Sequence, residues 1–310
     1  MGGKQRIYKQ RIRSTETLKK VFRAMELIAA SRIGKARAAA GASTPFAKAI
    51  TDAVAAVALH SDFDHPLTRP RTDTNRVAIV CVTADRGMAG AYSAVILRET
   101  EALIEKLKAE GKDPVLYVCG RRGDAFFRFR GVPIARSWTG ESDAPSKKMT
   151  SEVSDELLER FLDPNPETGV AEVHLVFTVF HNMVKQSVED RQMLPLTVVD
   201  EPQAPEETSA PVASATEAPN ARALYEFDPS PEGVLDQVLP LYVFTRIDHA
   251  LLQSAASELA SRQRSMHTAT DNAQELITNY TRLANSARQA EITQEISEIV
   301  SGADALNNAR

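Results

Sequence analysis

The C-terminal part of the chain carries a hydrophobic pattern typical of a long helix that packs against another helix. Small apolar residues recur there at alternating steps of three and four. They are Met266, Ala269, Ala273, Leu276, Tyr280, Leu283, Ala287 and Ala290. Residues 241 to 301 contain no Gly and no Pro, and Pro240 directly precedes this run. At about 1.5 Å of rise per residue the run would form a rod of roughly 90 Å, which its own chain cannot bury.

A second long helix is expected from about residue 4 to residue 60. Its apolar stripe consists of Leu18, Phe22, Met25, Ala29, Ile33, Ala36 and Ala40. Pro45 lies inside the run, and because the helical pattern continues beyond it we expect a kink. Two long helices at opposite ends of the sequence, each with a narrow apolar stripe, predict an antiparallel two-helix coiled coil. Its mostly small stripe residues bury little area, so a surrounding sleeve is indicated.

The middle of the chain changes to short apolar runs that alternate with helical segments. Strands are expected at 77–83, 114–120, 132–138, 173–180 and 193–199, and helices at 92–110, 123–129 and 151–162. Ser151 or Ser154 would be the N-cap of the last of these helices. The alternation predicts a largely parallel, doubly wound, Rossmann-like α/β domain in which the fifth strand pairs with the fourth.

The expected fold class is therefore α/β plus a long coiled coil. Residues 201–221 are rich in Pro, Ala and Glu and almost lack bulky apolar residues, which predicts a disordered loop. The expected divisions are an N-terminal coiled-coil helix (1–64), the α/β domain (72–200), the disordered loop (201–224) and a C-terminal coiled-coil helix (225–310).

Composition and charge narrow the possible functions. The net charge of −4 over 310 residues argues against a chain that binds nucleic acid as a whole. Residues 1–40 are nevertheless basic, which indicates either a solvated helix face or a surface for an acidic partner. Cys81 and Cys119 lie in apolar runs and are expected to be reduced core residues of a cytoplasmic protein. The sequence contains no run of about 18 apolar residues, so we expect no segment that spans a membrane.

One loop, DRGMAGAYS (85–93), has the composition of an active-site loop. A Gly-rich turn between a strand and a helix can hold a phosphate, but the spacing is that of neither a dinucleotide fingerprint nor a P-loop. A tight strand-to-helix turn is the alternative. The histidines show no metal-ligand spacing, and no nucleophile elbow, C-x-x-C pair or kinase signature occurs. We expect no catalytic residue, cofactor or metal, and a structural or mechanical role.

Several segments resemble the gamma subunit family of bacterial F-type ATP synthases, in the family's order over nearly the whole chain. They are RQAEITQEISEIVSGADAL (288–306), SELASRQRSMHTATDNAQELI (257–277), RAMELIAASRIGKAR (23–37), TADRGMAGAYS (83–93) and YEFDPSPEGVLDQVLP (225–240). The resemblance implies a non-catalytic rotor shaft inside a ring of three alpha and three beta subunits. The shaft would couple ion-driven rotation of the membrane c-ring, in a proton-translocating enzyme, to ATP synthesis or hydrolysis.

The resemblance also implies location and contacts. The α/β domain would form a foot with the epsilon subunit on the c-ring, as a peripheral protein at the cytoplasmic face of the bacterial cell membrane, without membrane insertion. The residues that match family contacts to the catalytic beta subunits are Arg262, Arg288, Gln289, Thr293 and Glu295. Met25 matches a position linked to coupling efficiency, with a plain core position as the alternative. Placing Met25 beside Arg262 puts residue 1 near residue 286 and leaves the C-terminal end of the helix alone.

Two other functions remain as alternatives. A basic coiled coil could bind nucleic acid through residues 4–37, although only Tyr8 and Phe22 supply aromatic rings there. An NAD- or nucleotide-dependent enzyme could be built on the α/β domain, but this function requires a phosphate loop that the sequence lacks.

Overall fold

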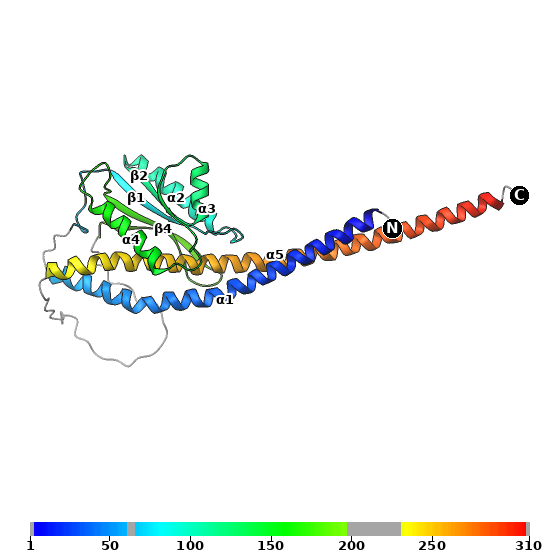
Figure 1. Ribbon diagram of the computed structural model, residues 1–310, viewed down its shortest axis with the longest axis horizontal. Coiled ribbons are helices and arrows are strands. Elements are labelled where there is room, and N and C mark those ends of the chain that lie inside the picture. The colour runs from blue at the N-terminus through cyan, green and yellow to red at the C-terminus, as the bar shows by residue number, and fades with distance from the viewer. Residues whose placement is uncertain (1–2, 61–65, 197–230, 308–310) are drawn as a thin grey trace, which may run out of the picture. The chain divides into compact units, whose positions relative to one another are not determined.

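The computed structural model describes residues 3–60, 66–196 and 231–307 (Figure 1). The predicted disordered loop, 201–224, lies outside the described residues. The elements in chain order are α1 (Gly3–His60), β1 (Arg76–Val82), α2 (Tyr92–Ala109), β2 (Asp113–Cys119), α3 (Arg121–Phe129), β3 (Ile134–Trp138), α4 (Lys147–Leu162), β4 (Glu172–Phe180), β5 (Gln186–Leu194) and α5 (Pro231–Asn307). Long helices at both ends of the chain, with the strands between them in sequence, confirm the predicted fold class.

The chain divides into two compact units, and both long helices contribute to each. Unit 1 takes its residues from 1–35, 86–91 and 258–310, and unit 2 from 36–85 and 92–257. Helix α1 runs without a break through Pro45, and α5 likewise runs through Pro240.

Unit 2 contains a five-stranded sheet in the order β3-β2-β1-β4-β5. Strand β1 pairs in parallel with β2 and β4, and β2 pairs in parallel with β3. Strand β5 is antiparallel to β4, with Val173 opposite Leu194 and Phe180 opposite Gln186. The predicted doubly wound sheet is confirmed, with one antiparallel edge strand.

The position predicted for the fifth strand, 193–199, is wrong, because the strand runs from Gln186 to Leu194. A short turn precedes it, in which the Asn182 side chain accepts the N–H groups of Val184 and Lys185. As an edge strand, β5 is partly open to solvent, so its sequence QSVEDRQML is mostly polar. Apolar periodicity therefore failed to mark it.

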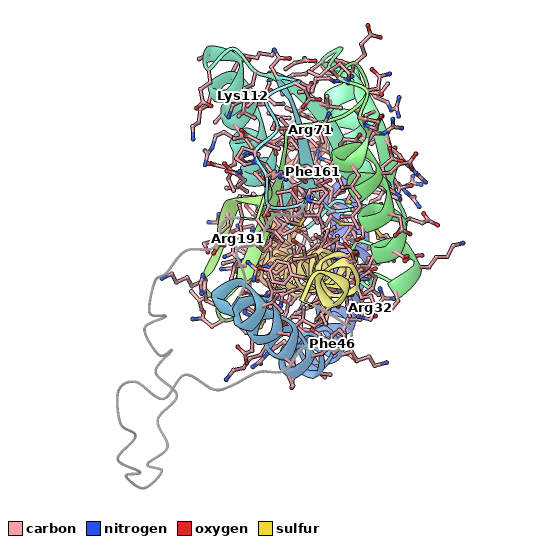
Figure 2. The ribbon with its side chains drawn as sticks, turned by 90° about the vertical axis from the view of Figure 1, so that its left-hand side faces the viewer. Arg32, Phe46, Arg71, Lys112, Phe161 and Arg191 are labelled. Carbon is pink, nitrogen blue, oxygen red and sulfur yellow. The ribbon has the colours of Figure 1, made fainter. Side chains whose placement is uncertain are left out.

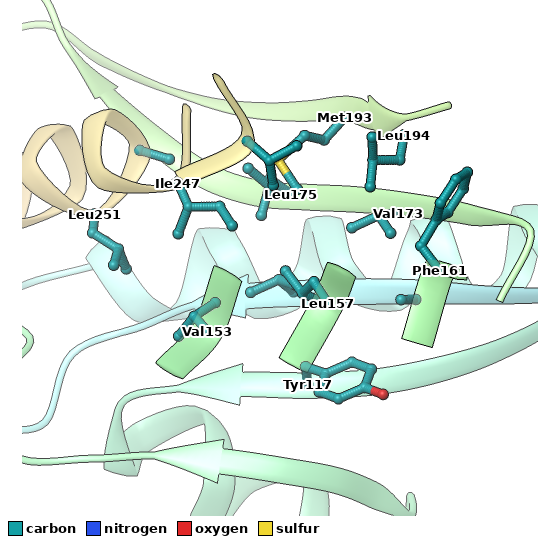
Figure 3. Close-up of a cluster of buried hydrophobic side chains, with 14 of the residues drawn as sticks. Tyr117, Val153, Leu157, Phe161, Val173, Leu175, Met193, Leu194, Ile247 and Leu251 are labelled. Atoms are coloured by element: carbon teal, nitrogen blue, oxygen red, sulfur yellow. The ribbon is translucent and has the colours of Figure 1, made fainter. Parts of the chain in front are cut away.

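Both faces of the sheet are covered. On β1, Ala78, Val80 and Val82 belong to a core shared with α4 and α5. Figure 3 shows Val153 and Leu157 of α4 and Ile247 of α5 directed into this core. On α2, which packs against β1, Thr100 donates a hydrogen bond to Cys81 Sγ at 3.2 Å. The alternation along β1 thus separates the two layers.

Helix α4 begins earlier than predicted. Ser146 is its N-cap and accepts the N–H of Met149 through Oγ at 3.2 Å, so the predicted caps Ser151 and Ser154 are wrong. The first turn begins with Lys147 and Lys148, so a prediction based on apolar positions did not include it. Ser154 is instead buried inside the helix.

The two cysteines are free thiols, both buried. Burial raises the pKa of the Cys81 thiol to about 12, and it raises the pKa of Cys119 as well. Both thiols are therefore inert near neutral pH.

Among the helices that the structure describes, none has the length and apolar character needed to cross a bilayer.

Candidate subunit-contact surface

In unit 1, the N-terminal half of α1 and the C-terminal half of α5 lie side by side and antiparallel (Figure 1). The seam between them is made by residues that are buried or half-buried at alternating steps of three and four. On α1 these are Gln5, Tyr8, Ile12, Thr15, Lys19, Phe22, Glu26, Ala29 and Ile33. On α5 they are Met266, Thr270, Ala273, Ile277, Tyr280, Ala284 and Ala287. The predicted coiled coil is confirmed.

Part of the predicted apolar stripe lies off the seam. Leu18 is 49% exposed on α1, and Leu276 and Leu283 are 46% and 38% exposed on α5. Ala290 is exposed too. Apolar residues occupy neighbouring positions, about 100° apart on the helix. Periodicity alone cannot choose between such positions, and the packing of the partner helix selected Ile277 and Ala284.

Contacts across the seam set its register. Lys19 Nζ lies 2.5 Å from Gln274 Oε1, and the ring centroids of Tyr8 and Tyr280 are 6.4 Å apart. Glu26 of α1 faces His267 of α5, so Met25 lies opposite a position about six residues C-terminal to Arg262. The antiparallel register is therefore shifted from the predicted one by about six residues, which is less than two helical turns.

A carboxylate occupies the centre of this seam. Glu26 is buried, and both of its oxygens accept hydrogen bonds from Arg23 Nη1 at 2.9 Å. His267 Nδ1 lies 3.2 Å from Glu26 Oε1 across the seam. A polar group at a core position costs stability but opposes helix sliding, because a shifted register would separate the carboxylate from His267, while Arg23 on the same helix would stay with it.

The Gly-rich loop groups with unit 1 and packs on α5. Ser261 Oγ donates a hydrogen bond to the Ala89 carbonyl at 2.7 Å. Gly90 has a φ of 58°, and a Cβ there would lie 2.6 Å from Ser265 Oγ. Gly90 is thus required for close approach of the loop to the helix. This contact supports the interpretation of the loop as a packed turn.

Arg262, one of the predicted contact residues, is held beneath this loop. Its guanidinium Nη2 lies 2.5 Å from Glu258 Oε1, one turn earlier on α5, and 3.5 Å from the Arg86 carbonyl. The side chains of Arg262 and Glu258 are both almost completely buried. Within the chain, Arg262 therefore joins the loop to α5.

The end of α5 presents a different surface. Every described side chain from Ile292 to Ser301 is exposed, and Ile299 reaches 72% exposure. At about 100° per residue, its bulky apolar residues share one side of the helix. They are Ile292, Ile296, Ile299 and Val300, named here the apolar arc. Within the described residues of α1 and α5, this part of α5 has no helix packed on it.

Four predicted contact residues border the apolar arc. From the helical period, Arg288 and Glu295 lie along one edge, and Gln289 and Thr293 lie along the other. All four are exposed. Thr293 Oγ1 donates to the Gln289 carbonyl at 2.9 Å, an ordinary helix contact. Met25 is half-buried beside the Glu26 cluster, which consists of Glu26, Arg23 and His267, and Arg262 is buried. The six predicted residues therefore fall in three places.

The prediction missed several residues that the structure brings forward. Glu26, Ser261 and Gly90 carry the polar contacts and the close approach described above. The sequence offered one indication of the role of Glu26, which is a charged residue spaced like the apolar residues of the stripe. The isoleucines of the apolar arc were visible in the sequence, but only packing shows that the chain leaves them uncovered.

No group of three His, Cys, Asp or Glu able to hold a metal ion occurs in the described part of the chain.

Comparison with known proteins decides the family. A family model described as ATP synthase matches residues 4–306. The ATP synthase gamma chain of Beutenbergia cavernae is 58% identical over 307 residues, covering 99% of each chain. The chain belongs to the ATP synthase gamma chain family. The gamma chain of Acidothermus cellulolyticus is 54% identical and covers 99% of this chain and 98% of its own.

Solved structures share the fold. A chain of the Euglena gracilis mitochondrial ATP synthase, solved with OSCP, F1 and c-ring, matches with a TM-score of 0.64 and 13% identity. The match covers 99% of this chain and 95% of the other. A chain of the Tetrahymena thermophila mitochondrial ATP synthase central stalk and c-ring matches with a TM-score of 0.54 and 18% identity, over 80% of this chain and 99% of the other.

Proposed function

We propose that this gamma chain is the central shaft of a rotary F-type ATP synthase and carries out no chemistry itself. The observation that carries the proposal is the apolar arc at the end of α5. A lone helix in water is marginally stable, and exposed isoleucines add an unfavourable hydration term. Both costs disappear if a ring of other subunits surrounds this end. The proposed ring has three alpha and three beta subunits.

The polar borders of the apolar arc supply the specific contacts in this proposal. Arg288, Gln289, Thr293 and Glu295 would contact the beta subunits, while the isoleucines turn against an apolar lining. Arg262 would act through the loop 86–91, because its guanidinium is committed to Glu258 and the Arg86 carbonyl. Met25 would affect coupling through its position beside the Glu26 cluster.

Coupling follows from asymmetry. A single helix pair cannot contact three catalytic sites of a ring identically. Each orientation of the shaft therefore favours a different conformation at each site through differential contact energy. Rotation would change these preferences in turn, so that one site releases ATP while another binds ADP and phosphate.

The proposal includes the remaining partners and the location. The α/β part would rest with the epsilon subunit on the c-ring, at the cytoplasmic face of the cell membrane, and rotation would be driven by protons. The related Euglena and Tetrahymena structures are of complexes that include a c-ring, which supports this placement.

The test is reconstitution of the full chain with an alpha–beta hexamer. We expect one chain per hexamer and an ATPase rate that changes on incorporation. Ile296→Glu places a charge in the apolar arc, and Gln294→Glu places the same charge on the opposite side of α5 as a matched control. Incorporation should fall at least tenfold for Ile296→Glu and stay within twofold for Gln294→Glu. Equal incorporation of both variants would contradict the proposal that a ring of other subunits surrounds this end of α5.

A second comparison separates contact from coupling. Arg288→Ala should leave incorporation unchanged and lower the ATPase rate several-fold, whereas Gln294→Ala, on the opposite side of the helix, should change neither. The isolated chain should bind no ATP. Binding of ATP by the isolated chain would favour the alternative of a nucleotide-dependent enzyme.

A further inference from the structure

Unit 2 contains a pocket between the β4–β5 hairpin and the early turns of α5. Its volume is about 200 Å³. The floor is apolar and includes Leu175, Phe177 and Met193, which are all buried. Figure 3 shows Leu175 and Met193 close together where α5 crosses these strands. Polar groups from both β5 and α5 also line the pocket.

Two arginines give the pocket a positive charge. The Arg246 guanidinium lies 5.7 Å from the centre of the Tyr242 ring, and no carboxylate in the described part of the chain pairs with it. Arg191, labelled in Figure 2, lies 5.8 Å from the centre of the Phe177 ring and pairs with Glu189 at 2.8 Å. Stacking on the rings limits the freedom of both guanidinium groups before any ligand arrives.

The pocket also holds polar groups with unused hydrogen-bonding capacity. Within the described residues, the side chains of Gln192, Arg246 and His249 have no hydrogen-bond partner. Burial, followed by the charges of Arg246 and Arg191, lowers the pKa of His249 and outweighs the opposing effects of Asp248 and Glu189. The neighbouring carboxylate of Asp248 is bound to Lys147 and Thr150. Nothing described on α5 therefore neutralises Arg246.

We propose that this pocket binds a small organic anion. A phosphate or carboxylate would accept hydrogen bonds from Arg246 and His249, and a small apolar body would cover Leu175 and Met193. The volume is several times the roughly 30 Å³ of a water molecule in the liquid. It is below the roughly 300–1,000 Å³ of pockets for drug-sized ligands, so the ligand is a small one. The pocket shares no residue with the apolar arc, and this proposal does not rest on the proposed rotary function.

The experiment measures the binding of small probes to the full chain by ligand-observed saturation-transfer NMR and titration calorimetry. The probes are phenyl phosphate, benzoate, inorganic phosphate and the neutral benzyl alcohol. We expect phenyl phosphate or benzoate to bind at least tenfold more tightly than benzyl alcohol. Binding of inorganic phosphate should also be at least tenfold weaker, because it leaves the apolar floor uncovered.

Variants locate the binding in the pocket. Arg246→Gln should weaken binding of the preferred probe at least tenfold, and Arg246→Lys should give an intermediate loss, because it keeps the charge without the planar fork. Arg282→Gln removes an exposed charge from the same helix outside the pocket and should change the affinity less than twofold. Circular dichroism establishes that each variant is folded.

Three results would overturn the proposal. The first is no binding of either aromatic anion at millimolar concentration, and the second is equal binding of benzyl alcohol. The third is an equal loss of affinity in Arg246→Gln and Arg282→Gln, which would indicate nonspecific attraction to positive charge. If Arg246→Gln does not fold, the comparison of Arg246→Lys with Arg282→Gln makes the same decision.

Discussion

His267 Nδ1 on α5 lies 3.2 Å from Glu26 Oε1 on α1, so a buried carboxylate of one helix meets an imidazole of the other. Around this contact the seam consists mainly of small or polar side chains, which permit several registers of similar energy. The polar pair distinguishes among them, because only the observed register places His267 beside the buried carboxylate.

Glu26→Leu is therefore expected to broaden the register of the coiled coil without unfolding it. Spin labels at Arg13→Cys and Thr278→Cys, both exposed positions, would report the distance between the helices by pulsed electron resonance. The native cysteines are buried and should stay unlabelled. We expect a broader distance distribution for Glu26→Leu and an unchanged one for Glu16→Leu, at an exposed position of the same helix. A single sharp distance in both would show that apolar packing alone sets the register.

Gly90→Ala is expected to destabilise the loop 86–91 by roughly 1–3 kcal/mol, because the added Cβ meets Ser265 and the backbone has a positive φ. Gly87 has open space around it, so Gly87→Ala is the matched control, with an expected change of about 0.5 kcal/mol or less. Hydrogen exchange of the loop amides measures both. Ser265→Ala should partly rescue Gly90→Ala by removing the nearest atom, and a complete absence of rescue would contradict the proposed clash.

Glu258→Ala should destabilise the chain by about 3–5 kcal/mol, because it leaves the Arg262 guanidinium buried without its carboxylate. The double variant Glu258→Leu with Arg262→Met should lie much closer to the parent, since neither charge then remains. Urea unfolding measures both. If the double variant is as unstable as Glu258→Ala, the pair contributes more than mutual neutralisation.

Asp85 predicts a specific dependence of stability on pH. Burial alone raises its pKa, but N–H donors of Ser142, Gly140 and Arg121 outweigh this effect and hold the pKa below its ordinary value. Because the pKa is lowered in the folded state, Asp85 stabilises the fold above its unfolded pKa of about 4. That stabilisation is lost as the pH falls below about 4 through the folded pKa.

Asp85→Asn should therefore destabilise the chain at pH 7 and reduce the loss of stability between about pH 5 and pH 3. Asp155→Asn, at an exposed position, is the control and should follow the parent at every pH. Urea unfolding over this pH range is the measurement. A parallel loss of stability in the parent and in Asp85→Asn would show that other groups cause the acid sensitivity.

The sequence by itself determined the long terminal helices, four of the five strands and their largely parallel arrangement. These features follow from local periodicity, which survives in any context: Val77 to Val82 reads as a buried strand wherever it lies. It also determined which residues border the apolar arc, because Arg288 and Glu295 share an edge of any helix that contains them. The edge strand β5 escaped this reasoning because solvent allows its exposed positions to be polar.

Only the tertiary structure decided which of two neighbouring apolar residues faces the seam, because both fit the same period. It placed Ile277 rather than Leu276 against α1, and it turned Arg262 inward to Glu258. It also brought Gly90 onto Ser265, and it placed Arg191 of β5 in one pocket with Arg246 of α5, so the members of each pair come together only when their elements pack. The physical reason is that periodicity fixes only the face of a residue within its own element. What that face meets depends on how the elements pack.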